Sequence, residues 1–226
     1  MNEIIIIIEA LVMFSALVLV KKFFGKSGIY VWISLATILA NIQLTKSINI
    51  LGMSATVGNV MFASTFLATD ILSECYGHKE AKKGVLLGLF SVIIFIISTQ
   101  ITLAFIPNEL DIANSAMQQL FTLTPRICIS SIIMFFLANW IDVLIYEKLK
   151  RIFREKKIWL RNNICTIICN SLENFGLFIL AFSGIYSIKE IIIMAISSSI
   201  IESIKALLDT PFLYIARKVK GSKKYE

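Results

Sequence analysis

The chain has 226 residues, of which 57% are hydrophobic and only 16% are charged, and its mean hydropathy is +0.81. A soluble domain of this length does not need so much apolar surface, so the composition excludes an ordinary soluble domain and predicts an integral membrane protein in contact with lipid. The formal net charge of +7 does not indicate a nucleic-acid partner, because the basic residues gather in short blocks between apolar runs.

Seven apolar stretches are long enough to cross about 30 Å of hydrocarbon, which takes roughly 20 helical residues. They cover about residues 4–20, 29–48, 55–76, 84–106, 126–147, 163–185 and 190–216. Because a chain in lipid must satisfy its own backbone hydrogen bonds, all seven are predicted to be helices. The start, "MNEIIIIIEA", has an acid where a signal peptide carries positive charge, so the first stretch is expected to stay in the mature protein. The sequence therefore predicts an all-α integral membrane protein, with residues 1–226 forming a single bundle of about seven transmembrane helices.

Basic residues mark one side of this bundle. They follow the first and third stretches, form the run "KLKRIFREKKIWLRNN" after the fifth, and end the chain. The opposite connections, "NILGMS", "PNELDIANSAMQQLFTLTPR" and "GIYSIKE", contain only Arg126 and Lys189 as basic residues. Because cytoplasmic loops are enriched in lysine and arginine, the N-terminus is predicted outside and the C-terminus in the cytoplasm.

Ionisable side chains occur inside the predicted helices, where each costs roughly 2.5 to 3.5 kcal/mol at the bilayer centre. They are therefore expected to face the interior of the bundle, and the polar residues of each stretch do share one helix face. The sets are Glu202, Lys205 and Asp209; Asn139 and Asp142; Asn170, Glu173 and Asn174; and Asp70 alone.

Two interpretations of these residues stay open. On the first, Lys205 only neutralises the two acids of its own helix and holds the bundle together. One central lysine does not neutralise five deep carboxylates, so on the second some acids are protonated, hydrated or bound to a ligand. We predict a binding site in the cytoplasmic half, between the third, fifth, sixth and seventh helices, with Asp70, Asp142 and Glu173 as the most ligand-facing acids.

Cysteine and histidine usage predicts no disulfide, metal or cofactor site. The single histidine, His78, falls in a loop, whereas an intramembrane hydrolase needs a metal cluster or a nucleophile with a base, so an enzyme is not expected. No glycine-rich phosphate loop is present for binding nucleotide. The cysteines, all in or beside apolar stretches, are Cys75, Cys128, Cys165 and Cys169.

Three separated segments carry a resemblance to a known family. In the order "FASTFLATDILSECYGHKEAKKG", "WLRNNICTIICNSLEN" and "IKALLDTPFLYIARKVK", they resemble the bacterial queuosine precursor transporters, also described as vitamin uptake transporters. The resemblance runs from about residue 41 to residue 220. It implies a multi-pass plasma-membrane carrier for a 7-deazaguanine base used in tRNA modification: 7-cyano-7-deazaguanine, 7-aminomethyl-7-deazaguanine or queuine. By motif position it implies roles for Asp70, Glu74, Arg161, Asn162 and Asp209.

A guanine-like ring suits the deep polar residues chemically. One carboxylate can accept its ring N–H and exocyclic amine together, its carbonyl needs a donor such as an amide or lysine, and its faces favour aromatic rings. For Asn41 and Gln43 hydrogen bonding between helices is an alternative, and Asn59 is expected near the outer face. Phe66, Trp140, Phe175 and Phe178 are stacking candidates, with simple packing as the alternative. The predicted substrate-binding residues are Asp70, Asn139, Asp142, Asn170, Glu173, Asn174, Lys205 and Asp209.

Two other functions fit the same composition. A substrate-binding membrane subunit would hand a vitamin to a separate ATP-driven module, and a non-transport assembly protein would show no saturable uptake. Transport by this chain alone in liposomes distinguishes the three. The sequence leaves open which deazaguanine is carried, whether transport is passive or proton-coupled, whether a partner ATPase is needed, and whether the chain forms a homo-oligomer.

Overall fold

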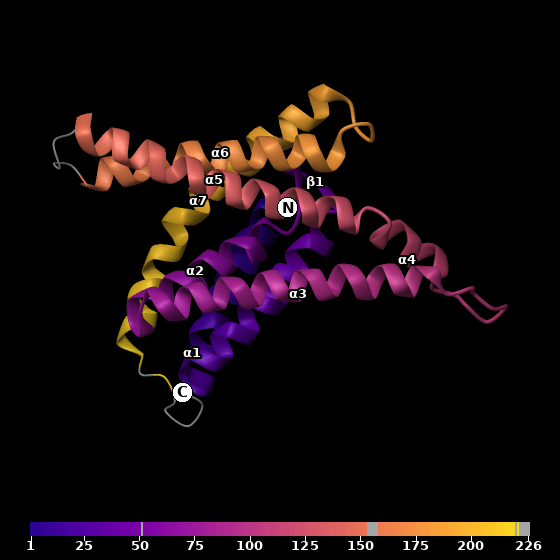
Figure 1. Cartoon of the computed structure of the whole chain (residues 1–226), viewed down its shortest axis with the longest axis horizontal. Coiled ribbons are helices and arrows are strands. Elements are labelled where there is room, and N and C mark those ends of the chain that lie inside the picture. The colour runs from indigo at the N-terminus through magenta and orange to yellow at the C-terminus, as the bar shows by residue number, and fades with distance from the viewer. Residues whose placement is uncertain (51, 153–157, 220, 222–226) are drawn as a thin grey trace.

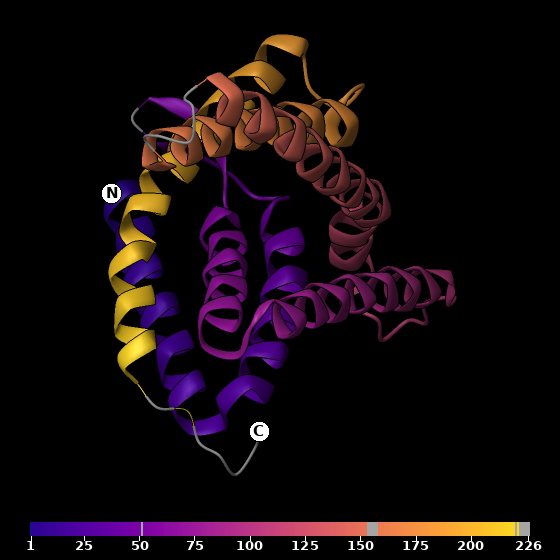
Figure 2. The same ribbon diagram turned by 60° about the vertical axis from the view of Figure 1, so that its left-hand side comes forward.

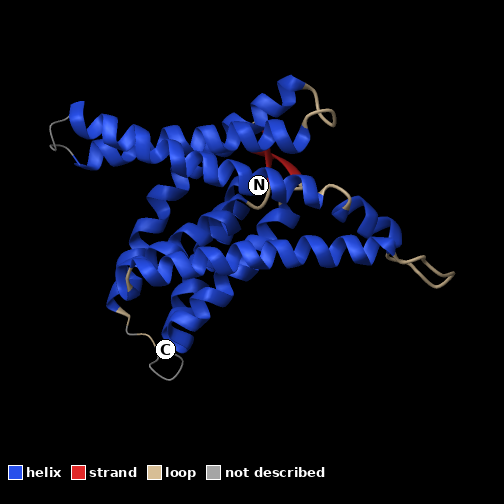
Figure 3. Ribbon diagram, viewed as in Figure 1, coloured by secondary structure: helices blue, strands red, loops and turns tan. Residues whose placement is uncertain are grey.

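Helices make up nearly all of the structure, a computed structural model that describes residues 1–50, 52–152, 158–219 and 221 (Figure 3). Side chains at positions 53, 54, 136, 139, 140, 142–144, 146, 147, 149–152, 158–166 and 203–210 lie outside this description. In chain order the elements are α1 (Asn2–Gln43), β1 (Ser47–Ile50), β2 (Met53–Thr56), α2 (Asn59–Tyr76), α3 (His78–Ala104), α4 (Asn114–Phe121), α5 (Thr124–Ile152), α6 (Ile158–Phe182) and α7 (Ile188–Lys218) (Figure 1).

α1 is a helical hairpin. Its dihedral angles are helical except at Gly25, where φ is 58° and ψ is −145°. A side chain disfavours this conformation, so glycine allows the chain to reverse direction here. Figure 2 shows the first half descending to the turn and the second half returning. The two halves correspond to the predicted stretches 4–20 and 29–48.

Each of the other five long helices overlaps one predicted stretch. α7 begins two residues before its predicted start because Ser187 and Glu190 form a capping box, in which the Ser187 N–H donates to Glu190 Oε2 at 2.8 Å. Among the described residues, α1 and α3 are the helices whose length and composition suffice to cross a membrane. The fold is therefore all-α apart from one short hairpin, and its apolar helices are consistent with a membrane protein.

Two elements differ from the prediction. β1 and β2 pair as an antiparallel hairpin, with Ser47 opposite Thr56, although the apolar pattern predicts helix ends and a short loop there. α4 lies within the long connection after α3, where only a loop was predicted. Both departures have one reason: apolar length detects helices that cross a membrane and carries no information about short elements between them.

Two apolar cores hold the helices together. The first packs both halves of α1 against α2, with Phe14, Ile29 and Leu72 fully buried. The second packs the end of α6 against α5 and α7 around Phe178. α7 belongs to both cores, because Ala216 near its end lies in the first. α7 therefore joins the α1–α2 part of the molecule to the α5–α6 part.

Lys21 fixes the end of α7 against the turn of the α1 hairpin. Its side chain is 3% exposed, and Nζ donates to the backbone carbonyls of Ala216 and Val219, the latter at 3.1 Å. Nζ also donates to Cys75 Sγ, at the end of α2, at 3.1 Å. One ammonium group thus connects three helices at the end of the molecule away from the β1–β2 hairpin.

Candidate functional site

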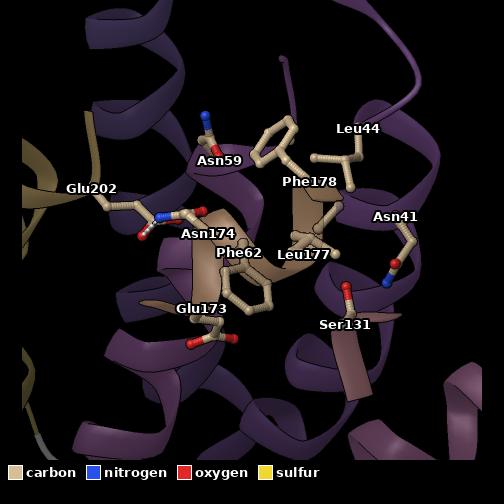
Figure 4. Close-up of a pocket in the computed structure, with 12 residues that line it drawn as sticks. Asn41, Leu44, Asn59, Phe62, Ser131, Glu173, Asn174, Leu177, Phe178 and Glu202 are labelled. Carbon is tan, nitrogen blue, oxygen red and sulfur yellow. Dashed lines mark hydrogen bonds between the residues drawn. The ribbon is translucent and has the colours of Figure 1, made fainter. Parts of the chain in front are cut away.

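A cavity lies between the core around Phe178 and a small apolar cluster of Ala36, Ala40 and Met61 (Figure 4). The space that it encloses, counted together with its opening to solvent, is about 460 Å³. α1, α2, α5, α6 and α7 all contribute to it. The lining residues are Ala40, Asn41, Leu44, Gly58, Asn59, Phe62, Ser131, Glu173, Asn174, Leu177, Phe178 and Glu202.

Three buried asparagines line the cavity, and their hydrogen bonds fix how each amide is turned. The Asn41 Nδ2 donates to the backbone carbonyl one turn earlier at 2.8 Å, and the Asn59 Nδ2 donates to the carbonyl three residues earlier at 3.2 Å. The Asn174 Nδ2 donates to Glu202 Oε2 at 2.7 Å. Carbonyl and ionised carboxylate oxygens cannot donate, so the nitrogen must occupy these positions. Figure 4 shows the Asn174 oxygen on the side away from Glu202.

Two carboxylates enter the lining, from Glu173 of α6 and Glu202 of α7. Both side chains are half-buried and line the same cavity. Glu202 accepts the bond from Asn174, whereas Glu173 makes no hydrogen bond or ion pair with any residue that the structure describes. A partly buried carboxylate without a donor is expected to find one in a ligand or in water.

Apolar side chains and one hydroxyl form the remaining wall. The Phe62 ring packs edge-on against Phe66, with 5.1 Å between ring centroids, and Phe178 is fully buried beside Phe182. Ser131 of α5 contributes a hydroxyl, which both donates and accepts. The lining therefore offers aromatic side chains for contact with a flat ring and polar groups for hydrogen bonds at the edge of that ring.

The structure brings two of the predicted site residues, Glu173 and Asn174, into this cavity. Asn170 lies one turn before Asn174, outside the lining. Asp70 is exposed on α2, eight residues beyond Phe62, which is about 12 Å along the helix axis. The other four predicted side chains lie outside the described residues: Asn139, Asp142, Lys205 and Asp209.

Asp70 and the cavity lie at different heights on α2. The cavity is at the start of α2, which is the outer end in the predicted orientation, whereas the sequence placed the site in the cytoplasmic half. Phe62, Phe66, Asp70 and Glu74 follow one another at four-residue intervals and so share one face of α2. Glu74 ends this face in an ion pair with Arg217 at 3.7 Å.

Several lining residues were not among the predicted set. Asn59 was expected near the outer surface, yet it is 8% exposed at the start of α2, where its Nδ2 also reaches Ser198 Oγ at 3.4 Å. Glu202 was grouped with the lysine of its own helix and not with Asn174. No sequence pattern marked Ser131 or Phe62 as site residues, because the chain has many other serines and phenylalanines in its apolar stretches. The closeness of Asn41 and Asn59 could have been predicted from the sequence, because a short connection brings the end of one helix next to the start of the following helix.

Metal binding has no support in the described part of the chain, where no group of three His, Cys, Asp or Glu side chains could hold an ion.

Comparison with known proteins gives the family. Residues 56–216 match the family model described as "Putative vitamin uptake transporter". The chain belongs to this family. The match confirms the resemblance carried by the three sequence segments, and it makes the protein a membrane transporter and not an enzyme.

A relative from Bacillus subtilis (strain 168) is named "Probable queuosine precursor transporter". It is 36% identical over 211 residues, which cover 93% of this chain and 92% of the relative. This similarity extends beyond the family match into the α1 hairpin. No solved structure matches the chain.

Proposed function

We propose that this transporter imports a 7-deazaguanine base, a precursor of queuosine, across the bacterial plasma membrane. The observation that carries the proposal is the carboxylate of Glu173, which lines the cavity without a donor among the described residues. The ring N–H and exocyclic amine of a guanine-like base supply two adjacent donors for one carboxylate. The name of the Bacillus subtilis relative supports the same substrate class.

The remaining groups of the cavity complement this base. The Ser131 hydroxyl donates to the ring carbonyl, and the rings of Phe62 and Phe178 contact the faces of the base. The amides of Asn59 and Asn174 keep their nitrogens on protein acceptors and present oxygens to further N–H groups.

Other predicted site residues extend the binding region beyond the cavity. Asp70 is proposed as a polar position that the base passes on its way to the cytoplasm, because it shares a face of α2 with Phe62. The remaining residues are proposed from their sequence positions on α5, α6 and α7: Asn139, Asp142, Asn170, Lys205 and Asp209.

The proposed organisation in the membrane has seven crossings, with the N-terminus outside and the C-terminus in the cytoplasm. The α1 hairpin supplies two crossings, and α2, α3, α5, α6 and α7 supply one each. Support comes from helix length and from the one-sided distribution of basic loops.

Uptake by a bacterial host unable to make 7-deazaguanines tests the proposal, with queuosine in tRNA as the readout. The wild-type chain should restore queuosine when the base is supplied. Glu173→Gln should lower the apparent uptake affinity about tenfold or more, because one acceptor oxygen becomes a donor that faces the donor pair of the base. Glu109→Gln, an identical change in the exposed connection after α3, should leave uptake unchanged.

Each alternative predicts a different result. If Glu173→Gln keeps normal uptake affinity at equal membrane abundance, the substrate does not bind in this cavity. Uptake that requires a co-expressed ATPase, with none by the purified chain in liposomes, would make the chain a subunit of an ATP-driven system. Absence of saturable uptake would favour an assembly role.

A further inference from the structure

One face of α3 is apolar and exposed along most of its length. The opposite face packs on α1, where a Cβ at Gly84 would lie 2.8 Å from Ile33 Cδ1 and a Cβ at Gly88 would lie 3.0 Å from Ile33 Cγ2. The exposed apolar side chains recur about once per helical turn, so they form a single stripe, called here the α3 stripe. It consists of Leu86, Phe90, Ile93, Ile94, Ile97 and Ile101, each between 42% and 64% exposed.

Three lysines continue the α3 stripe at the start of the helix. This lysine cluster, Lys79, Lys82 and Lys83, precedes Leu86 by seven, four and three residues, so it shares the face of the stripe. All three side chains are exposed. The Lys83 Nζ lies 5.4 Å from the centroid of the Tyr30 ring, and no member of the cluster forms an ion pair with a residue that the structure describes.

The acids nearest to the cluster in the sequence have other partners. Glu80 accepts a hydrogen bond from the Tyr30 hydroxyl and pairs with Lys26 at 3.8 Å. Glu74 pairs with Arg217 at 3.7 Å. The lysine cluster therefore presents positive charge next to an exposed apolar surface, at the end of α3 that is cytoplasmic in the proposed orientation.

We propose that an anionic phospholipid of the cytoplasmic leaflet binds this face of α3, with its phosphate at the lysine cluster and an acyl chain on the α3 stripe. α3 is long and apolar enough to cross a membrane, so the stripe lies at the depth of the acyl chains and the lysines lie at the depth of the headgroups. Basic side chains at that depth attract anionic headgroups. The lipid thus supplies both the apolar surface and the negative charge that this face lacks.

A second copy of the chain fits this face less well. Two copies in one membrane have the same orientation, so a two-fold contact through α3 would place the two lysine clusters beside each other. Such a contact brings like charges together, which opposes association. A phosphate at the same place is attracted by all three lysines.

Native mass spectrometry of the purified full-length chain tests the proposal, with equal amounts of phosphatidylglycerol and phosphatidylcholine that carry the same acyl chains. The wild-type chain should retain at least about tenfold more phosphatidylglycerol than phosphatidylcholine. Lys79→Gln/Lys82→Gln should lower this ratio at least about threefold, because it removes two of the three charges. Lys46→Gln/Lys189→Gln is the matched control, since both lysines are exposed and lie on the outer side in the proposed orientation, and it should keep the ratio. Melting temperatures verify that each variant is folded.

Several results would overturn the proposal. Equal retention of the two lipids by the wild-type chain would show that the headgroup is not recognised, and an unchanged ratio in folded Lys79→Gln/Lys82→Gln would place recognition elsewhere. Equally effective competition by soluble glycerol phosphate would make this a site for a free anion to which the stripe contributes nothing. A lipid-free dimer that Phe90→Ala dissociates would mean that a second copy covers the stripe. These results are independent of uptake through the cavity.

Discussion

Lys21 is a residue whose sequence position and structural surroundings indicate different roles. In the sequence it belongs to the basic block after the first apolar stretch, and such blocks mark orientation. In the structure it is buried against the end of α7, where the backbone carbonyls of Ala216 and Val219 accept its N–H groups. The carbonyl end of a helix carries partial negative charge, so an ammonium group there is stabilised without a carboxylate.

Replacing Lys21 by methionine should therefore destabilise the protein. The substitution keeps an unbranched side chain but leaves the two carbonyls without their donor, so the free energy of unfolding should fall by about 1–3 kcal/mol. Lys22→Met is the matched control, because Lys22 is exposed and, within the described part of the chain, its Nζ lies over the ring of its neighbour Phe23. Thermal unfolding of both variants in detergent provides the comparison. Equal melting temperatures would show that the Lys21 contacts do not stabilise the fold.

The candidate site could be predicted only in part, because sequence spacing relates residues of one helix and not of two. Glu173 and Asn174 were identified since polar groups inside an apolar stretch must face something polar. Glu202 was assigned to the lysine of its own helix, whereas it accepts a hydrogen bond from Asn174, which lies 28 positions away on α6. The orientation of the asparagine amides also depends on contacts that spacing does not reveal.

At the scale of elements, the junction between α1 and α2 forms one edge of the cavity. Gly58 precedes α2 with φ at +97°, and a Cβ at this position would lie 2.7 Å from the carbonyl oxygen of Ala40 and 3.2 Å from Gln43 Cβ. Both the backbone conformation and the close approach therefore require glycine. The start of α2 is held against the end of α1, with Asn41 and Asn59 on either side of the contact.

Gly58→Ala should destabilise the protein and disturb the cavity. The strained backbone and the collision with Ala40 together should lower the free energy of unfolding by about 1–3 kcal/mol. Gly52→Ala isolates the backbone contribution, because Gly52 also has a positive φ, +79°, but a Cβ there meets nothing within 4 Å. Thermal unfolding and uptake should both be measured. Similar losses in the two variants would mean that the Ala40 contact contributes nothing.

The helices that could be predicted from the sequence are those whose apolar length matches the thickness of a membrane. All seven apolar stretches correspond to helical segments, with one pair joined through Gly25 as α1. The β1–β2 hairpin and α4 were not predicted, because their residues are too few to give a periodic or apolar-length signal. The hairpin matters for the site, since β2 leads directly into Gly58 and Asn59.

At the scale of the whole molecule, the cavity lies between two packed groups of apolar side chains. Ala40 lies in a small cluster with Met61, whereas Leu44 and Phe178 belong to the core around α6. Packed groups move as units more readily than they deform, so a shift of the small cluster against this core would change the opening of the cavity. α7 contacts both parts and is fastened at its end by Lys21, which makes it the element that couples them.

α3 provides a direct test of the proposed orientation. It has 27 residues, which span about 40 Å and exceed the roughly 30 Å of hydrocarbon, and its mean hydropathy over the most apolar window is 2.3. Lys79 at its start and Asn108 beyond its end are both exposed. If α3 crosses the membrane, these two positions lie on opposite sides, and the lysines beside Lys79 place that end in the cytoplasm.

Single cysteines at these two positions should therefore react differently in intact cells. The native Cys75, Cys128, Cys165 and Cys169 are first replaced by serine or alanine, so that only the introduced thiol is labelled. A membrane-impermeant thiol reagent should modify Asn108→Cys directly and Lys79→Cys only after permeabilisation, because the bilayer shields the cytoplasmic thiol. Uptake by each variant verifies that it is folded and inserted. The reverse pattern would invert the proposed orientation, and modification of both in intact cells would mean that α3 does not separate two sides of the membrane.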